Sequence, residues 1–283
     1  MDGVQNDHPL GNAGSVLLEV SARARAPPDS EGRAPRLGSG AAVASCGGAL
    51  TALSPDFTRG ALNVNGEGYS TLLQRSVDFD AYAEIPVGGL YANYPSLRER
   101  PLILSLIQQV WDRAEASGYA QHMTTSPLPS TPQHQVLMHL AYGDHQVSNL
   151  TAENEARTVG AKIITPALKP GRHWDSNPFF GIPTIGLFPF TQSALVYWDG
   201  GPLGFTGTGG DPPGGNNEGT SKAPITNLPN RSGEDPHSYP RRVPAARAQI
   251  SDFWNGSILF PCGGTGTIGS AAPCFSNGYL GIP

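Results

Sequence analysis

The stretch Gln135-Val136-Leu137-Met138-His139-Leu140-Ala141-Tyr142-Gly143-Asp144 decides the fold. Its largely apolar run from Val136 to Ala141, interrupted only by His139, predicts a short, buried β-strand. Asp144 comes directly after Gly143, so we expect its carboxylate at the tip of that strand. A strand tip is a position from which a carboxylate can orient a catalytic histidine.

A second informative stretch, Gly233-Glu234-Asp235-Pro236-His237, places a histidine in a polar, proline-bounded loop. A strand-tip acid followed much later by a loop histidine is the chain order of the last two members of a Ser-Asp-His triad. We therefore predict that Asp144 orients His237 and that His237 is the general base. The alternatives are an Asp144 that only caps its turn and a His237 that is an ordinary surface residue. His145 belongs to the same turn as Asp144 and is expected to point elsewhere.

The candidate nucleophile is Ser45, in Ala44-Ser45-Cys46-Gly47-Gly48. Small residues around a serine suit the tight strand-to-helix turn of a nucleophile elbow, although Val43 stands where glycine is usual. The backbone N–H of Cys46 would then be one oxyanion-hole donor. The alternative is a tight turn with no catalytic role.

The rest of the pattern alternates strands with helices, which predicts an α/β fold with a mostly parallel sheet. Residues 1–38 are predicted to be poorly ordered, and residues 39–283 to form one domain with a long loop over 199–236. The apolar face of a helix is predicted to consist of Leu102, Leu106 and Val110 together with Leu104, Ile107 and Trp111. The expected strands span 57–64, 136–141, 161–164 and 193–198, and the expected helices span 97–116, 151–159 and 245–254.

Composition and charge limit the kinds of binding partner that we expect. The 283 residues carry a net charge of -5, and no Lys/Arg cluster is present, which argues against nucleic-acid binding. No apolar stretch is long enough to span a bilayer. The first residues show no basic start followed by an apolar run, so no signal peptide is visible.

Three cysteines are present, of which Cys262 and Cys274 bracket a Gly-rich segment. We expect them to form a disulfide in an oxidising space, which hints at a periplasmic or secreted origin; two free thiols are the alternative. Asp199 and Asp211 are weak candidates for calcium ligands, but a solvated polar loop is the simpler interpretation. No other cofactor is predicted.

Three segments together resemble the C-terminal half of a bacterial α/β-hydrolase of an esterase-like group. They are Gly47 to Phe57, Gly143-Asp144-His145-Gln146-Val147, and Gly233 to His237 with Pro240-Arg241-Arg242. The resemblance implies a triad of Ser45, Asp144 and His237. Only 44 residues precede Ser45, so we expect a fold that lacks the family's usual N-terminal strands.

The predicted function is hydrolysis of a carboxylic ester or lactone, with a small molecule as substrate. The sequence does not choose between these two substrates, and it gives no indication of oligomeric state. One alternative is an inactive hydrolase remnant that binds an acyl ligand or a partner protein. Another is a metal-assisted lactonase that uses the acidic residues of 199–218.

Overall fold

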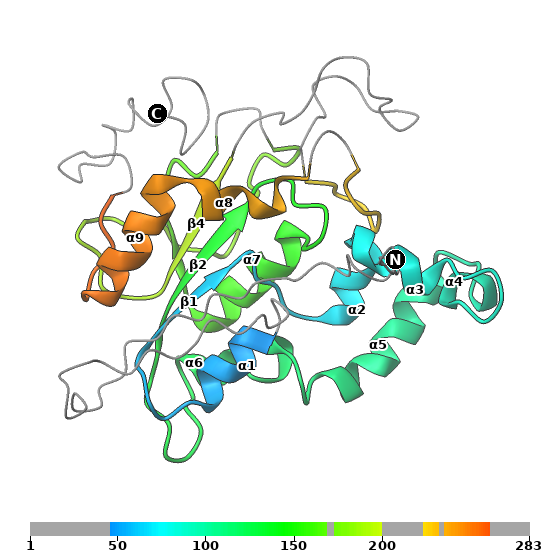
Figure 1. The fold of residues 1–283 in the computed structure, drawn as a ribbon, viewed down its shortest axis with the longest axis horizontal. Coiled ribbons are helices and arrows are strands. Elements are labelled where there is room, and N and C mark those ends of the chain that lie inside the picture. The colour runs from blue at the N-terminus through cyan, green and yellow to red at the C-terminus, as the bar shows by residue number, and fades with distance from the viewer. Residues whose placement is uncertain (1–45, 169–172, 200–222, 232–234, 261–283) are drawn as a thin grey trace, which may run out of the picture.

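A four-stranded, all-parallel sheet forms the centre of the molecule (Figure 1). The computed structural model describes residues 46–168, 173–199, 223–231 and 235–260. The strands are β1 (Arg59–Asn63), β2 (Gln135–Ala141), β3 (Lys162–Ile163) and β4 (Ala194–Trp198), in the order β1-β2-β4-β3. The expected α/β class is therefore confirmed.

The central strand is β2, the stretch that the sequence singles out. It pairs with β1 from Gln135 to His139 and with β4 from Leu137 to Ala141. Every residue of β2 after Gln135 is buried, because helices cover both faces of the sheet. Met138 belongs to one apolar core and Leu137 to the other, as the alternation of side chains along a strand requires.

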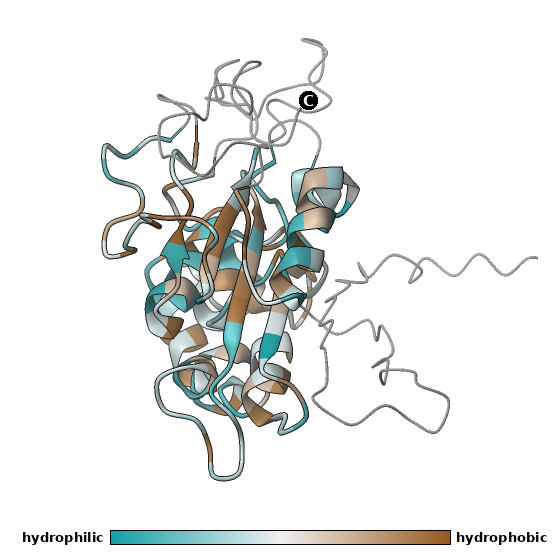
Figure 2. Cartoon of the chain, turned by 90° about the vertical axis from the view of Figure 1, so that its left-hand side faces the viewer, coloured by the Kyte–Doolittle hydropathy of each residue, from teal (hydrophilic) through white to brown (hydrophobic). Residues whose placement is uncertain are grey.

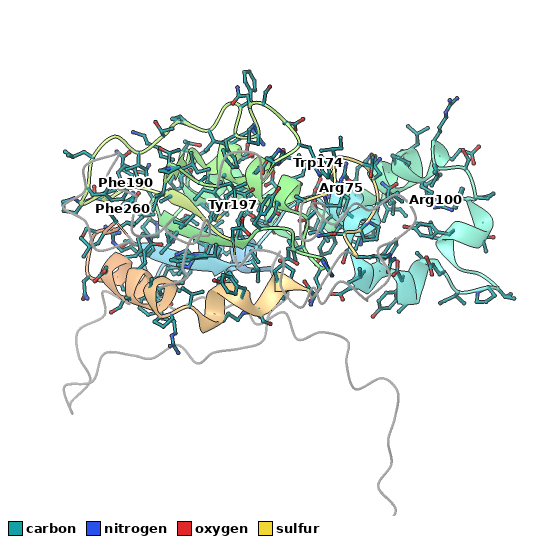
Figure 3. All side chains as sticks on the ribbon, turned by 90° about the horizontal axis from the view of Figure 1, so that it is seen from above. Arg75, Arg100, Trp174, Phe190, Tyr197 and Phe260 are labelled. Atoms are coloured by element: carbon teal, nitrogen blue, oxygen red, sulfur yellow. The ribbon has the colours of Figure 1, made fainter. Side chains whose placement is uncertain are left out.

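Helices pack on both faces, and Figure 3 shows the sheet between α7 (Asn149–Val159) and the α8–α9 segment. With α7 lie α1 (Cys46–Leu53) and α6 (Ala120–Met123); on the other face lie α8 (Tyr239–Arg242) and α9 (Pro244–Trp254). Figure 2 shows hydrophobic residues along the central strands. Tyr197 of β4, labelled in Figure 3, donates to Glu153 of α7 at 2.5 Å and so ties the sheet to that helix.

Several predicted elements are confirmed, with shifted ends. The strand expected over 57–64 is β1, the one over 161–164 shortens to β3, and the helix expected over 151–159 begins at Asn149. That helix ends at Gly160, whose φ of 70° is the left-handed conformation that glycine adopts at a helix C-terminus. The segments 1–38, 200–222 and 232–234 lie outside the described residues.

The connection from β1 to β2 is a helical region beside the sheet, which the sequence did not predict in detail. It contains α2 (Tyr69–Leu72), α3 (Asp80–Ala83), α4 (Leu90–Asn93) and α5 (Glu99–Trp111), together with one-turn 3₁₀ helices at Leu73–Arg75, Val77–Phe79 and Ala116–Gly118. Figure 1 shows α3, α4 and α5 to the side of the sheet rather than on one of its faces, and Arg100 marks this region in Figure 3.

One helix prediction is wrong in part. The helix expected over 97–116 ends at Trp111, and most of its expected apolar face is exposed. Leu102, Leu106 and Val110 are 67%, 64% and 67% exposed, whereas Leu104 is buried. Periodicity identifies one face of a helix but does not say whether another element covers it.

None of the described helices is long and apolar enough to cross a membrane.

Candidate functional site

The turn after β2 fixes the Asp144 carboxylate. Gly143 has a φ of 81°, a left-handed conformation that glycine adopts without strain, and the chain turns there. Oδ1 of Asp144 then accepts hydrogen bonds from the backbone N–H groups of Gln146 at 2.8 Å and Val147 at 3.0 Å. The carboxylate therefore caps its own turn, as the alternative to the catalytic role expected. Its two oxygens can still accept further hydrogen bonds.

His237 reaches Asp144 from a one-turn 3₁₀ helix, Pro236–Ser238. Its Nδ1 lies 2.9 Å from Oδ2 and 3.1 Å from Oδ1 of Asp144. Each of the two residues is only 3% exposed. We assign the ring proton to Nδ1, because that nitrogen faces a carboxylate, and the basic lone pair to Nε2.

The environment of His237 favours its protonated form. Burial by itself lowers the pKa of the ring, whereas the charge and the hydrogen bond of Asp144 raise it, and the net direction is upward. Nε2 is buried and has no hydrogen-bond partner among the described residues. The ring thus presents an unpaired basic nitrogen whose cation is stabilised, which is what general-base catalysis requires.

Two asparagines that the sequence did not single out for this role hold the turn at Gly143 through hydrogen bonds to its backbone. Asn149 donates to the carbonyl of Ala141 at 2.7 Å and accepts from the N–H of Gly143 at 2.9 Å. Asn230 donates to the carbonyl of Gly143 at 2.7 Å. Asn149 stands at the start of a predicted helix, a recognisable signal; no pattern in the sequence points to Asn230.

The predicted nucleophile, Ser45, lies outside the described residues. The next residue, Cys46, begins α1, and its Sγ lies 3.6 Å from the carbonyl oxygen of Ala114. Burial, and then the charge of Glu115, raise the pKa of the Cys46 thiol. Figure 1 shows α1 well apart from α8, which begins two residues after His237. The structure brings Asp144 and His237 together and does not bring Cys46 to them; the roles of Ser45 and Cys46 stay predictions.

The metal and disulfide predictions fall largely outside the described residues, which do not include Asp211, Cys262 or Cys274. Asp199 is buried directly after β4. Within the described ranges, no group of three or more His, Cys, Asp or Glu side chains has an arrangement that could hold a metal ion. The weak calcium prediction and the disulfide prediction therefore stay predictions.

A buried acidic cluster, absent from the sequence predictions, lies between the end of β1 and α7. Glu155 accepts from Asn65 Nδ2 at 2.7 Å, and Glu115 accepts from the N–H groups of Gly68 and Tyr69 at 3.0 and 3.1 Å. Burial, and then the charge of Glu67, raise the pKa of Glu155 to about 8. Burial, and then Glu115, raise the pKa of Glu67 to about 7. Glu155 is therefore mostly protonated at neutral pH.

A polar cavity of about 320 Å³ opens at the amino-terminal ends of the strands, whereas the Asp144–His237 pair lies at their carboxyl ends. It is lined by residues at or before the starts of β2 and β4, among them Gln135 and Ser193, and by Thr124 and His134. Since Asp144 and His237 follow the strands rather than precede them, this cavity does not serve the pair.

The pair stands at the carboxyl ends of parallel strands, where open α/β sheets place their ligands. No significant match to a family model, a curated protein or a solved structure was found for this chain, so its arrangement of side chains is the basis for any functional assignment.

Proposed function

We propose that this chain hydrolyses a carboxylic ester or lactone, with His237 as general base and Asp144 as its orienting acid. Ser45 is the nucleophile that the sequence suggests, although α1, which begins at the next residue, lies apart from the pair. The observation that carries the proposal is the buried ring of His237, held through Nδ1 by Asp144 at 2.9 Å, with Nε2 unpaired among the described residues. A histidine in this state is ready to take a proton from a hydroxyl group.

The order of elements supports an α/β-hydrolase assignment as part of the same proposal. A helix, α1, precedes β1; the acid follows the central strand β2; and the histidine comes after β4. Nucleophile, acid and histidine follow one another in this order in α/β-hydrolases.

The proposed chemistry has two steps. First, Nε2 of His237 takes the proton of the serine hydroxyl while its oxygen attacks the ester carbonyl; the imidazolium then returns that proton to the leaving alkoxide, which leaves an acyl-enzyme. Second, Nε2 takes a proton from water, the hydroxide attacks the acyl group, and the proton returns to serine. Asp144 stabilises the imidazolium in both steps. A lactone is an internal ester, so the same steps open its ring.

Turnover of a short-chain aryl ester and of a simple lactone tests the proposal, with wild type compared with His237→Ala. We expect a loss of about 10³-fold or more in kcat. His122→Ala is the matched control, because His122 is a partly exposed histidine of α6 whose Nδ1 bonds to the carbonyl of Ser126. Turnover of His237→Ala within a few-fold of wild type would remove His237 from the site.

A binding protein derived from a hydrolase is the second candidate, favoured by the position of Cys46 away from the pair. A serine-reactive aryl phosphonate separates the two, because an unactivated serine reacts poorly. Labelling of wild type that disappears in His237→Ala supports the enzyme. Absence of both labelling and turnover in folded wild type supports the binding protein.

A further inference from the structure

Asp235 joins the two segments that carry the catalytic pair. Its Oδ1 accepts from the backbone N–H of His237 at 3.0 Å and from the backbone N–H of His145 at 3.2 Å. Its Oδ2 accepts from the Gln146 side chain at 2.7 Å. One carboxylate therefore holds the turn that presents Asp144 and the 3₁₀ turn that presents His237.

The segment that carries His237 depends on such a tie. The 3₁₀ helix Pro236–Ser238 has only three residues, and so short a helix has little stability of its own. Asp235 caps its start, since its side chain accepts from the N–H of His237. The same oxygen also accepts from the backbone N–H of His145, the residue directly after Asp144. The cap therefore fixes the position of His237 relative to Asp144.

We propose that Asp235 is a positioning residue that sets the geometry of the Asp144–His237 pair. The catalytic consequence rests on the proposed ester hydrolysis; the structural consequence does not. A displacement of about 1 Å in a catalytic group costs on the order of 10²-fold in rate. Loss of all three bonds should therefore lower kcat much more than it changes KM.

Charges on several elements face His237, and they allow position to be separated from charge. Burial lowers the pKa of the ring, Asp144 raises it, Arg241 of α8 lowers it and Asp235 raises it. Asp78, in the turn Val77–Phe79, also interacts with the charge of His237. Among the described residues, the Asp78 side chain makes no hydrogen bond to the segment that carries His237. Asp78→Asn therefore removes a negative charge near His237 but leaves the hydrogen bonds of Asp235 in place.

The experiment compares Asp235→Ala, Asp235→Asn, Gln146→Leu and Asp78→Asn, each checked for folding by circular dichroism. Two readouts are measured: kcat and KM for an aryl ester, and the ¹H NMR signals of His237, namely the low-field Nδ1 proton and the titration of the ring.

For Asp235→Ala we expect a fall in kcat of about 10²-fold, KM within about threefold, and a weakened or shifted Nδ1 proton signal. Asp235→Asn keeps one acceptor oxygen, so it should recover part of the lost kcat while moving the acidic limb of kcat/KM to lower pH. Gln146→Leu loses one bond and no charge, so it should lower kcat less and leave the pH profile in place.

Asp78→Asn should keep the Nδ1 signal and kcat within about threefold of wild type. The inference fails if folded Asp235→Ala, or folded Asp235→Asn should the alanine variant not fold, keeps both the wild-type Nδ1 signal and wild-type kcat. If wild type turns over no ester, the NMR readout alone decides: a changed signal supports the positioning role while ester hydrolysis fails, and an unchanged signal overturns the positioning role too.

Discussion

Replacing Glu155 with glutamine should make the protein more stable at alkaline pH and change it little at acidic pH. Glu155 is fully buried in α7, and its Oε1 has no partner among the described residues. Burial, followed by the charge of Glu67, raises its pKa from 4.5 to about 8. The folded state therefore holds this proton more tightly than the unfolded chain does.

The direction and the size of the effect follow from proton linkage. Because the folded state binds the proton more tightly, stability is highest below pH 4.5, falls as the pH rises from there to about 8, and then levels off. A pKa change of this size corresponds to about 5 kcal/mol at full deprotonation, since each pH unit contributes about 1.4 kcal/mol. At pH 7 the loss is about 3 kcal/mol. Glutamine carries no charge at any of these pH values and escapes the loss.

Urea unfolding of wild type and Glu155→Gln at pH 5, 7 and 9 measures the effect. We expect similar free energies of unfolding at pH 5 and a variant that is several kcal/mol more stable at pH 9. Glu99→Gln, a change at an exposed position of α5, is the control and should follow wild type. Glu67→Gln should lower the pKa of Glu155, because the charge of Glu67 raises it. Parallel stability curves for wild type and Glu155→Gln over the whole range would refute the reasoning.

Three further predictions concern the proposed site and the cysteines. Asp144→Asn should lower kcat by about 10⁴-fold while the fold is retained, and harmless substitution would show that another acid orients His237. Ser45→Ala should block both phosphonate labelling and ester turnover; a label found on a different serine by peptide mapping would move the nucleophile. Cys262 and Cys274 should be joined after oxidative refolding, and mass spectrometry that finds two free thiols would contradict this.

The central strands β2 and β4 were predictable because they are mostly apolar runs. Val136 to Ala141 has a paired strand on each side and helices on both faces, so every residue is buried and all but His139 are apolar. His139 bonds to the Gln249 side chain of α9 at 2.7 Å. The proximity of Asp144 and His237 was predictable for a different reason: each stands in a local setting, a strand tip and a polar loop, that the predicted triad requires. Their side chains lie 2.9 Å apart, while their catalytic roles stay predictions.

What the sequence did not reveal depends on distant neighbours. Leu102, Leu106 and Val110 have the spacing of a buried helix face, yet no described element covers them. Asp235 resembles any acidic loop residue until the fold brings the turn at His145 against it. Glu155 reads as a surface residue of a polar helix, although packing against the start of α1 buries it. Such contacts follow from tertiary structure and have no local pattern.

The contact between Asp144 and His237 joins positions 93 residues apart in the chain. Bringing the ends of so long a loop together has an entropic cost that is recovered only when the whole sheet and α8 are in place. A partly folded chain can retain helices, and hence a normal far-ultraviolet spectrum, without this contact. The low-field Nδ1 proton signal of His237 would therefore measure the fraction of correctly folded molecules in a preparation, which the helix content alone does not report.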